Sequence, residues 1–235
     1  MIKYFRVVNL SDYGPSKSAS EVRCARLTRG RRDASAESRP QVKTQAYDII
    51  AIGASAGGLR ALEKILEHLP ENLEAPVVVV QHLDPRHRSL MAKILSRHTK
   101  AQVKQAEEGE ALEAGKIYIA PPNRHLLINR DRTISLSQSE LVHFVRPSAD
   151  LLFESVAATY KDRAIAVILT GTGSDGAMGI QAIKKMGGTT IAQDEQSSEF
   201  YGMPSSAIRT GKVDFILPLS EIGPALVTLV RGEEL

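Results

Sequence analysis

Cysteine and long apolar segments are almost absent from this sequence of 235 residues. Its one cysteine, Cys24, cannot form an internal disulfide, and so small a number fits a reducing compartment. A cluster of thiolate metal ligands is excluded for the same reason. No apolar run approaches the ~20 residues that a membrane-spanning helix needs. We therefore expect a cytoplasmic protein that does not insert into a membrane.

A net positive charge is absent from most of the chain, although the net charge of the whole is +3. Residues 1–46 hold ten Lys/Arg and four Asp/Glu and so carry +6, whereas the remaining residues carry −3. This basic front segment is rich in Ser and Arg and shows no sustained periodicity. We predict a flexible extension over residues 1–46 and a folded domain over residues 47–235. The folded part gives no reason to expect a nucleic-acid partner.

From Tyr47 onward, buried-type apolar runs alternate with segments of helical periodicity. The apolar runs predict strands at Tyr47–Ile52, Val77–Val80, Ala164–Leu169, Thr189–Ala192 and Val213–Leu217, with shorter strands and hairpins between residues 103 and 136. Helices are predicted after residue 57, near Ser89–His98, and at Asp150–Tyr160, Asp175–Met186 and Leu219–Val230. This alternation predicts an α/β fold, a doubly wound and mostly parallel sheet with helices on both faces.

Three polar residues follow three of these apolar runs. Ser55 comes after the first run, His82 after the second, and Asp175 after the run that ends at Leu169. In a parallel sheet the carboxyl ends of the strands meet at one edge, where open α/β sheets bind ligands. A hydroxyl, an imidazole and a carboxylate placed there suit nucleophilic catalysis.

Ser55 lies in Gly53-Ala54-Ser55-Ala56-Gly57, which satisfies the G-x-S-x-G pattern of a nucleophile elbow. The pattern places a serine on a tight strand-to-helix turn, where the next backbone N–H group, that of Ala56, can stabilise an oxyanion. A glycine-rich turn that only lets a helix pack close to a strand fits this segment equally well. Dinucleotide binding fits less well, because serine stands where the middle glycine would admit a pyrophosphate.

His82 is the one histidine of six that directly ends a predicted buried strand, so it is the preferred base. Asp175 has a second interpretation, as the N-cap of the helix that follows it. A phosphate-binding loop is disfavoured, because no lysine follows Gly176 as it does in a P-loop. The order Ser–His–Asp differs from that of ordinary α/β-hydrolases, but a triad is recognised by its roles and not by its order.

Several motifs together resemble the chemotaxis receptor methylesterase family, whose members are called CheB-type. The motifs occur in family order and are GASAGG at 53–58, VVVVQH at 77–82, LTGTGSDGA at 169–177 and YGMP at 201–204, with similar segments at 120–123 and 146–150. The resemblance covers the chain from Tyr47 to its end. It implies hydrolysis of glutamate γ-methyl esters on receptor helices with release of methanol, and deamidation of receptor glutamines as a second activity.

The resemblance also implies roles for single residues. The nucleophile is Ser55, the base His82 and the orienting acid Asp175, with no metal or cofactor. Backbone N–H groups of Ala56 and Thr172 would form the oxyanion hole, although Thr172 replaces a methionine that is common in the family. The expected substrate contacts are Arg86, Arg146 and Met203, for which solvated surface arginines and a core methionine are the simpler interpretations.

Two departures from the family pattern affect regulation and substrate. The 46 residues before Tyr47 are too few for the receiver domain of the well-known chemotaxis enzymes, so we expect no phosphorylation control within this chain. The segment Leu83–Ser89 is closer to versions fused to, or partnered with, a methyltransferase. The expected substrate is thus a methylated chemoreceptor or another methylated signalling protein, and the expected partner a methyltransferase or a response regulator.

Two other functions remain open at this point. A non-catalytic α/β module could use the same sheet to bind a nucleotide or a partner, and a general hydrolase could act on small esters. Covalent labelling of Ser55 would distinguish the methylesterase from a non-catalytic module. Hydrolysis of methylated receptor peptides would distinguish it from a general esterase.

Overall fold

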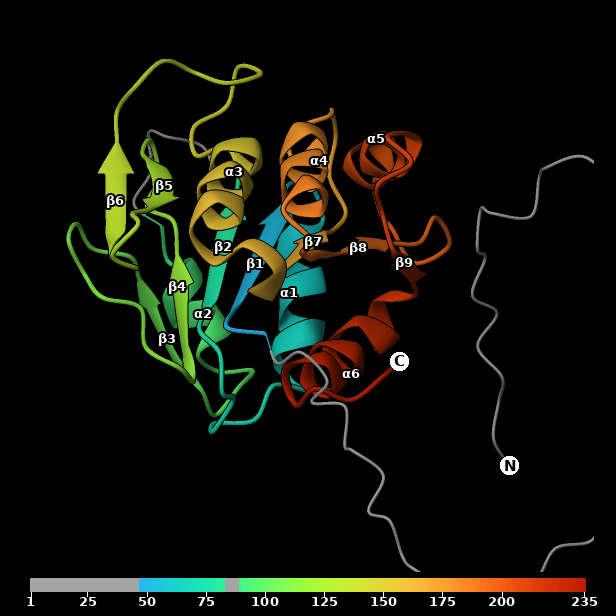
Figure 1. Cartoon of the computed structure of the whole chain (residues 1–235), viewed down its shortest axis with the longest axis horizontal. Coiled ribbons are helices and arrows are strands. Elements are labelled where there is room, and N and C mark those ends of the chain that lie inside the picture. The colour runs from blue at the N-terminus through green and yellow to red at the C-terminus, as the bar shows by residue number, and fades with distance from the viewer. Residues whose placement is uncertain (1–46, 83–88) are drawn as a thin grey trace, which may run out of the picture. The chain divides into compact units, whose positions relative to one another are not determined.

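The computed structural model describes residues 47–82 and 89–235, and within them seven parallel strands form one central sheet (Figure 1). The predicted extension, residues 1–46, and the segment 83–88 with Arg86 lie outside the described residues. The strands of the sheet are β1 (Ile49–Ala54), β2 (Val77–Gln81), β3 (Gln102–Gln105), β4 (Lys116–Ile119), β7 (Ala164–Ile168), β8 (Thr189–Gln193) and β9 (Phe215–Leu217). A separate antiparallel pair consists of β5 (His125–Ile128) and β6 (Ile134–Ser137).

The strand order is β3-β4-β2-β1-β7-β8-β9, so the chain winds outward from β1 in both directions. The first half of the chain builds one side through β2, and the second half builds the other side from β7. The point where the winding direction changes lies between β1 and β7. Crevices at such points are where doubly wound sheets bind ligands, so the topology itself marks the carboxyl ends of these strands.

Helices cover both faces of the sheet, as Figure 1 shows. They are α1 (Gly58–Leu66), α2 (Met91–Leu95), α3 (Ala149–Tyr160), α4 (Ala177–Lys185), α5 (Gly202–Arg209) and α6 (Leu219–Val230), with a short 3-10 helix at Lys161–Arg163. Side chains of α1, α2 and α6 form one apolar cluster with the sheet, and those of α3, α4 and α5 form another. The predicted α/β fold is confirmed.

Alternation along β1 explains why there are two cores. Ile50 and Ile52 point into the cluster under α1 and α6, whereas Ile49 and Ala51 point into the cluster under α3. Successive side chains of a strand face opposite sides of a sheet. A strand that is covered on both faces must therefore be apolar throughout, and all six residues of β1 are buried.

The sequence pattern did not predict α5, which begins at Gly202 in the YGMP segment. Its first turn contains Gly202 and Pro204, two residues that are poor helix formers in a helix interior. Proline is compatible with a first turn, however, because the N–H group that it lacks has no partner within the helix there. The other differences are at the ends of elements: α4 begins at Ala177 and not at Asp175, β9 begins at Phe215 and not at Val213, and α2 covers only Met91–Leu95 of the predicted Ser89–His98.

Gly179 makes a testable prediction about the packing of α3 against α4. A Cβ atom at this position would lie 2.5 Å from Phe153 Cβ and 3.1 Å from the carbonyl oxygen of Asp150. Glycine-to-alanine changes in helices usually stabilise. At Gly179 the close approach of α3 leaves no room for a methyl group, so the substitution should destabilise. We expect Gly179→Ala to lower the free energy of unfolding by about 1–3 kcal/mol.

Urea denaturation of the two proteins measures this difference. Lys185→Ala, on the exposed side of the same helix, is the control and should change stability by less than about 0.5 kcal/mol. A stabilised Gly179→Ala protein would contradict the close packing of α3 and α4.

Candidate active site

Ser55 is held by hydrogen bonds from both neighbouring strand ends. Its N–H group donates to Thr170 O just after β7 (3.0 Å), and its carbonyl oxygen accepts from Gln81 Nε2 at the end of β2 (2.7 Å). The N–H of Gly58, the first residue of α1, also donates to this carbonyl (2.9 Å). The tight turn between β1 and α1 that the G-x-S-x-G pattern predicts is therefore present and fixed on two sides.

Gly171 lets the turn after β7 approach Ser55. A Cβ atom on Gly171 would lie 2.8 Å from Ser55 Cβ and would overlap the sulfur of Met203. Any larger residue would push the two turns apart. Met203 is 1% exposed and supports Gly171 from the core, so we do not propose it as a substrate contact.

His82 lies beside Ser55 because β1 and β2 pair in register. The His82 N–H group donates to Ala54 O (3.1 Å), which continues the ladder by one residue. The imidazole Nε2 lies 2.8 Å from Asp175 Oδ2. Because the aspartate can only accept when ionised, Nε2 carries the proton, and Nδ1 is the nitrogen left for Ser55. Within the described residues Ser55 Oγ makes no direct hydrogen bond to the ring.

Asp175 is 3% exposed and accepts four hydrogen bonds. Besides His82, the donors are Ala149 N (2.6 Å), Ser148 Oγ (2.7 Å) and Asp150 N (3.2 Å). Burial acts to raise the pKa of Asp175, but the hydrogen bonds from His82, Ser148 and Ala149 outweigh it and hold the pKa below its ordinary value. The group is therefore a carboxylate at neutral pH.

The alternative prediction for Asp175, that it caps the helix that follows it, is wrong, because Asp175 caps a different helix. Its carboxylate meets the first turn of α3, a different helix, where free N–H groups and the helix dipole favour an anion. The helix that follows, α4, has Gly176 as its N-cap residue and receives no hydrogen bond from a capping side chain. Asp175 thus joins the N-terminus of α3 to the imidazole of His82.

His125 supports this arrangement and was not recognised from the sequence. It is fully buried at the start of β5, where Nε2 contacts Glu140 O (3.0 Å) and Nδ1 accepts from Ser148 N (3.2 Å). Burial lowers the pKa of His125, so its ring is neutral at neutral pH. The ring fixes Ser148, which caps α3 and donates to Asp175. Only the tertiary packing reveals this role, because the residues next to His125 in the sequence carry no signal for it.

The backbone N–H groups of Ala56 and Thr172 are the expected donors to an oxyanion at Ser55. Within the part of the chain that the structure describes, the N–H groups of Ala56 and Thr172 donate no hydrogen bond. The Ala56 N–H belongs to the same peptide unit as the Ser55 carbonyl, which Gln81 Nε2 holds (2.7 Å), so this bond orients the Ala56 N–H. Thr172 lies on the exposed turn after β7. The oxyanion role of both residues stays a prediction.

Arg146 makes hydrogen bonds within the protein, and its expected contact with substrate stays a prediction. Its Nε and Nη2 donate to Asn123 Oδ1 (3.0 and 2.7 Å), and its Nη1 donates to the carbonyl oxygens of Gln138 and Ser139 (3.0 and 2.6 Å). These bonds use four of the five guanidinium donors. Arg146 therefore ties the segment after β6 to the loop after β4.

A cavity of about 320 Å³ opens beside Ser55. Its lining includes Leu59, Arg60, Gln81, Met91 and Glu199. A larger hollow of about 450 Å³ lies among residues 67–70 and 97–100 and contains none of the three candidate catalytic groups. We take the smaller cavity as the candidate substrate pocket because Ser55 lines it. Its volume is large enough for one side chain of a substrate.

Within 47–82 and 89–235, no group of three or more His, Cys, Asp and Glu side chains is arranged to hold a metal ion. The same part of the chain has no helix that is long and apolar enough to span a bilayer.

Comparison with known proteins agrees with this geometry. The sequence model of the family described as CheB methylesterase matches residues 50–226. This chain belongs to the CheB methylesterase family. In the crystal structure of the CheB methylesterase catalytic domain of Thermotoga maritima, a chain of 40% identity superimposes with a TM-score of 0.76. That match covers 79% of this chain and 100% of the other.

Curated CheB relatives differ in how much of their length this chain covers. A Leptospira interrogans protein, named as a candidate protein-glutamate methylesterase/protein-glutamine glutaminase, is 44% identical over 78% of this chain and 95% of its own. The protein-glutamate methylesterase/protein-glutamine glutaminase of Pyrococcus abyssi is also 44% identical, over 77% of this chain but 50% of its own. The chain thus corresponds to one region of the longer CheB proteins.

Asp150 gives a pH prediction for the site. Burial raises its pKa, which the nearby Asp175 carboxylate raises further, against a hydrogen bond from Gly179 N. Because the pKa of Asp150 is higher in the folded than in the unfolded protein, this carboxyl stabilises the fold fully below its ordinary pKa of 3.8. That stabilisation is lost as the pH rises through the folded-state pKa. Asp150→Asn keeps an acceptor for Gly179 and carries no charge. We therefore expect its stability relative to the unsubstituted protein to improve as pH rises from about 4 to about 8.

Urea denaturation of both proteins across that pH range measures the effect. Asp175 does not mask it, because the pKa of Asp175 is lowered and its own contribution is complete above the ordinary value. A stability difference that stays constant with pH would show that burial of Asp150 does not raise its pKa.

Proposed function

We propose that this protein is a serine-type protein-glutamate methylesterase that removes γ-methyl esters from chemoreceptor glutamates and releases methanol. The observation that carries the proposal is the hydrogen bond of His82 to the buried Asp175, placed beside Ser55 at the switch point of the sheet. The names of the CheB relatives supply the substrate class. We place the reaction in the cytoplasm, where receptor helices are methylated.

The proposed reaction begins with attack of Ser55 Oγ on the ester carbonyl carbon. His82 Nδ1 accepts the hydroxyl proton, and the imidazolium that forms is stabilised by the Asp175 carboxylate. The oxyanion receives hydrogen bonds from the N–H groups of Ala56 and Thr172, each worth roughly 3–4 kcal/mol in the transition state. His82 then protonates the leaving methoxide, and methanol departs.

Water completes the cycle by hydrolysing the glutamyl ester of Ser55. His82 removes a proton from the water and returns it to Ser55 Oγ as the acyl bond breaks. A glutamine side chain reacts in the same way with ammonia as the leaving group. This shared acyl-enzyme chemistry explains how one site serves both activities in the relatives' names, and we propose deamidation as the second activity.

Ser55→Ala tests the nucleophile. We expect a fluorophosphonate probe to label the unsubstituted protein covalently and to leave Ser55→Ala unlabelled. Methanol release from a methylated chemoreceptor fragment should fall by a factor on the order of 10⁶, as for loss of a triad nucleophile in other serine enzymes. Mass spectrometry of the labelled protein and radiolabelled methanol release measure the two effects.

Ser139→Ala is the matched control, because this serine is exposed and lies outside the site. It should be labelled and should release methanol at the unsubstituted rate. Labelling that persists in Ser55→Ala with native circular dichroism would exclude Ser55 as the nucleophile. Turnover of simple acyl esters without release of receptor methyl groups would instead indicate a general esterase.

A further inference from the structure

An exposed hairpin beside the candidate active site has an unusual backbone. Val142 and Val145 pair across it through two hydrogen bonds, of 3.2 and 2.9 Å. The two residues between them, His143 and Phe144, have φ values of 50° and 64°. Tight hairpin turns of this kind normally use glycine or asparagine at both positions. Side chains that persist in this conformation commonly mark a functional role.

The tip of this hairpin is apolar and protrudes. Phe144 is 95% exposed and Leu141 is 54% exposed, so the described residues leave the phenylalanine ring almost uncovered. A phenylalanine in the left-handed region gains nothing in stability from such exposure. The ring is therefore better explained by contact with another molecule.

Specific contacts attach the tip to the triad. His143 Nε2 lies 3.2 Å from Asp150 Oδ2, and Asp150 Oδ1 accepts from Gly179 N (2.7 Å). The tip is thus held at the first turn of α3, which is bonded through Asp150 to the first turn of α4, where Met178 is 57% exposed. Asp150 N also donates to Asp175 (3.2 Å). We call Leu141, Phe144 and Met178 the hairpin patch.

The cavity beside Ser55, of about 320 Å³, has room for one substrate side chain, so we expect other contacts with a protein substrate to lie outside it. On the proposed function, that substrate is a bundle of receptor helices. A phenylalanine ring that projects from a tight turn can insert into an apolar groove. The groove between two packed helices is a surface of that shape. We infer that the hairpin patch docks the methylated substrate, with Phe144 inserted between the helix that bears the ester and its neighbour.

Binding in a catalytically inactive background tests this inference, which rests on the proposed function. The probe is a methylated helical chemoreceptor cytoplasmic fragment, and the protein is the full chain carrying Ser55→Ala. Fluorescence anisotropy gives the Kd. We expect Phe144→Ser to raise the Kd about tenfold, which is typical for loss of an aromatic anchor. Phe144→Leu should recover most of the affinity, and Met178→Ser should weaken binding by a smaller factor.

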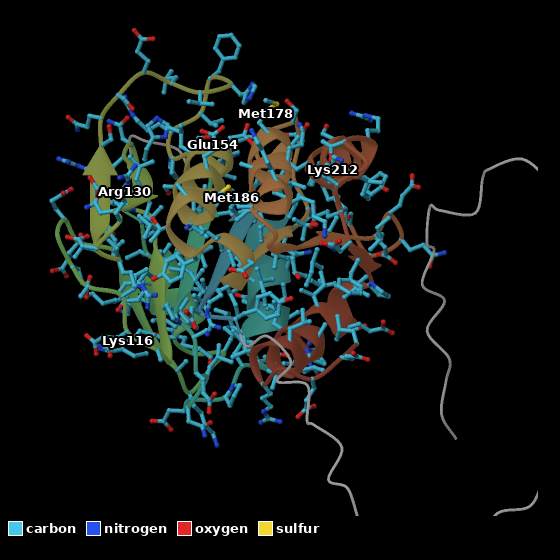
Figure 2. All side chains as sticks on the ribbon, in the orientation of Figure 1. Lys116, Arg130, Glu154, Met178, Met186 and Lys212 are labelled. Carbon is cyan, nitrogen blue, oxygen red and sulfur yellow. The ribbon has the colours of Figure 1, made fainter. Side chains whose placement is uncertain are left out.

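Met186→Ser is the matched control. Met178 lies in the first turn of α4 and Met186 follows its last residue; Figure 2 labels them well apart, and Met186 is also exposed, at 38%. Its Kd should stay within about twofold of the parent value. In the active background, Phe144→Ser should leave the rate of fluorophosphonate labelling unchanged, because the substitution does not touch Ser55, His82 or Asp175.

Four results would overturn the inference. They are an unchanged Kd in Phe144→Ser, an equal loss in Met186→Ser, a slowed labelling reaction, or a dimer in sedimentation that Phe144→Ser dissociates. The last would make a second copy of this chain the occupant. The proposed function fails separately, if the fragment binds but the active protein releases no methanol from it.

Discussion

The buried carboxylate of Asp175 is the interaction on which the candidate site depends. The carboxylate accepts one hydrogen bond from His82 and three from the N-terminal region of α3, so both of its oxygens are hydrogen-bonded. An unpaired buried charge would cost several kcal/mol. The same contacts that make the charge tolerable also fix where the imidazole lies. Stability and positioning are therefore supplied by one set of bonds.

Parallel pairing explains how residues so far apart in the chain reach this carboxylate. β1 lies between β2 and β7, and the residue after each strand continues the hydrogen-bonding pattern by one step. Ser55 is thereby flanked by His82 on one side and Thr170 on the other. A shift of one residue in either pairing would turn these side chains to the other face of the sheet. Register, set by apolar strands covered on both faces, determines the site.

The strands and the three candidate catalytic residues could be predicted from the sequence, because apolar periodicity and strand ends are local signals. The runs before Ser55, His82 and Asp175 identified the strands, and parallel geometry then placed their carboxyl ends at one edge. The helix α5 was not predicted, because Gly202 and Pro204 weaken its propensity while Met203 packs under Gly171. His125 and Ser148 were not recognised either. Their importance depends on which helix Asp175 meets, and no local pattern reports that.

The orientation of the His82 ring has a consequence for the length of the turn after β7. Nε2, the nitrogen farther from the backbone, faces the acid, and the nearer Nδ1 remains for the nucleophile. Asp175 correspondingly lies several residues beyond the end of β7, and the turn between them carries it to the N-terminus of α3. The length of this turn, and not the strand itself, therefore sets where the acid meets the imidazole.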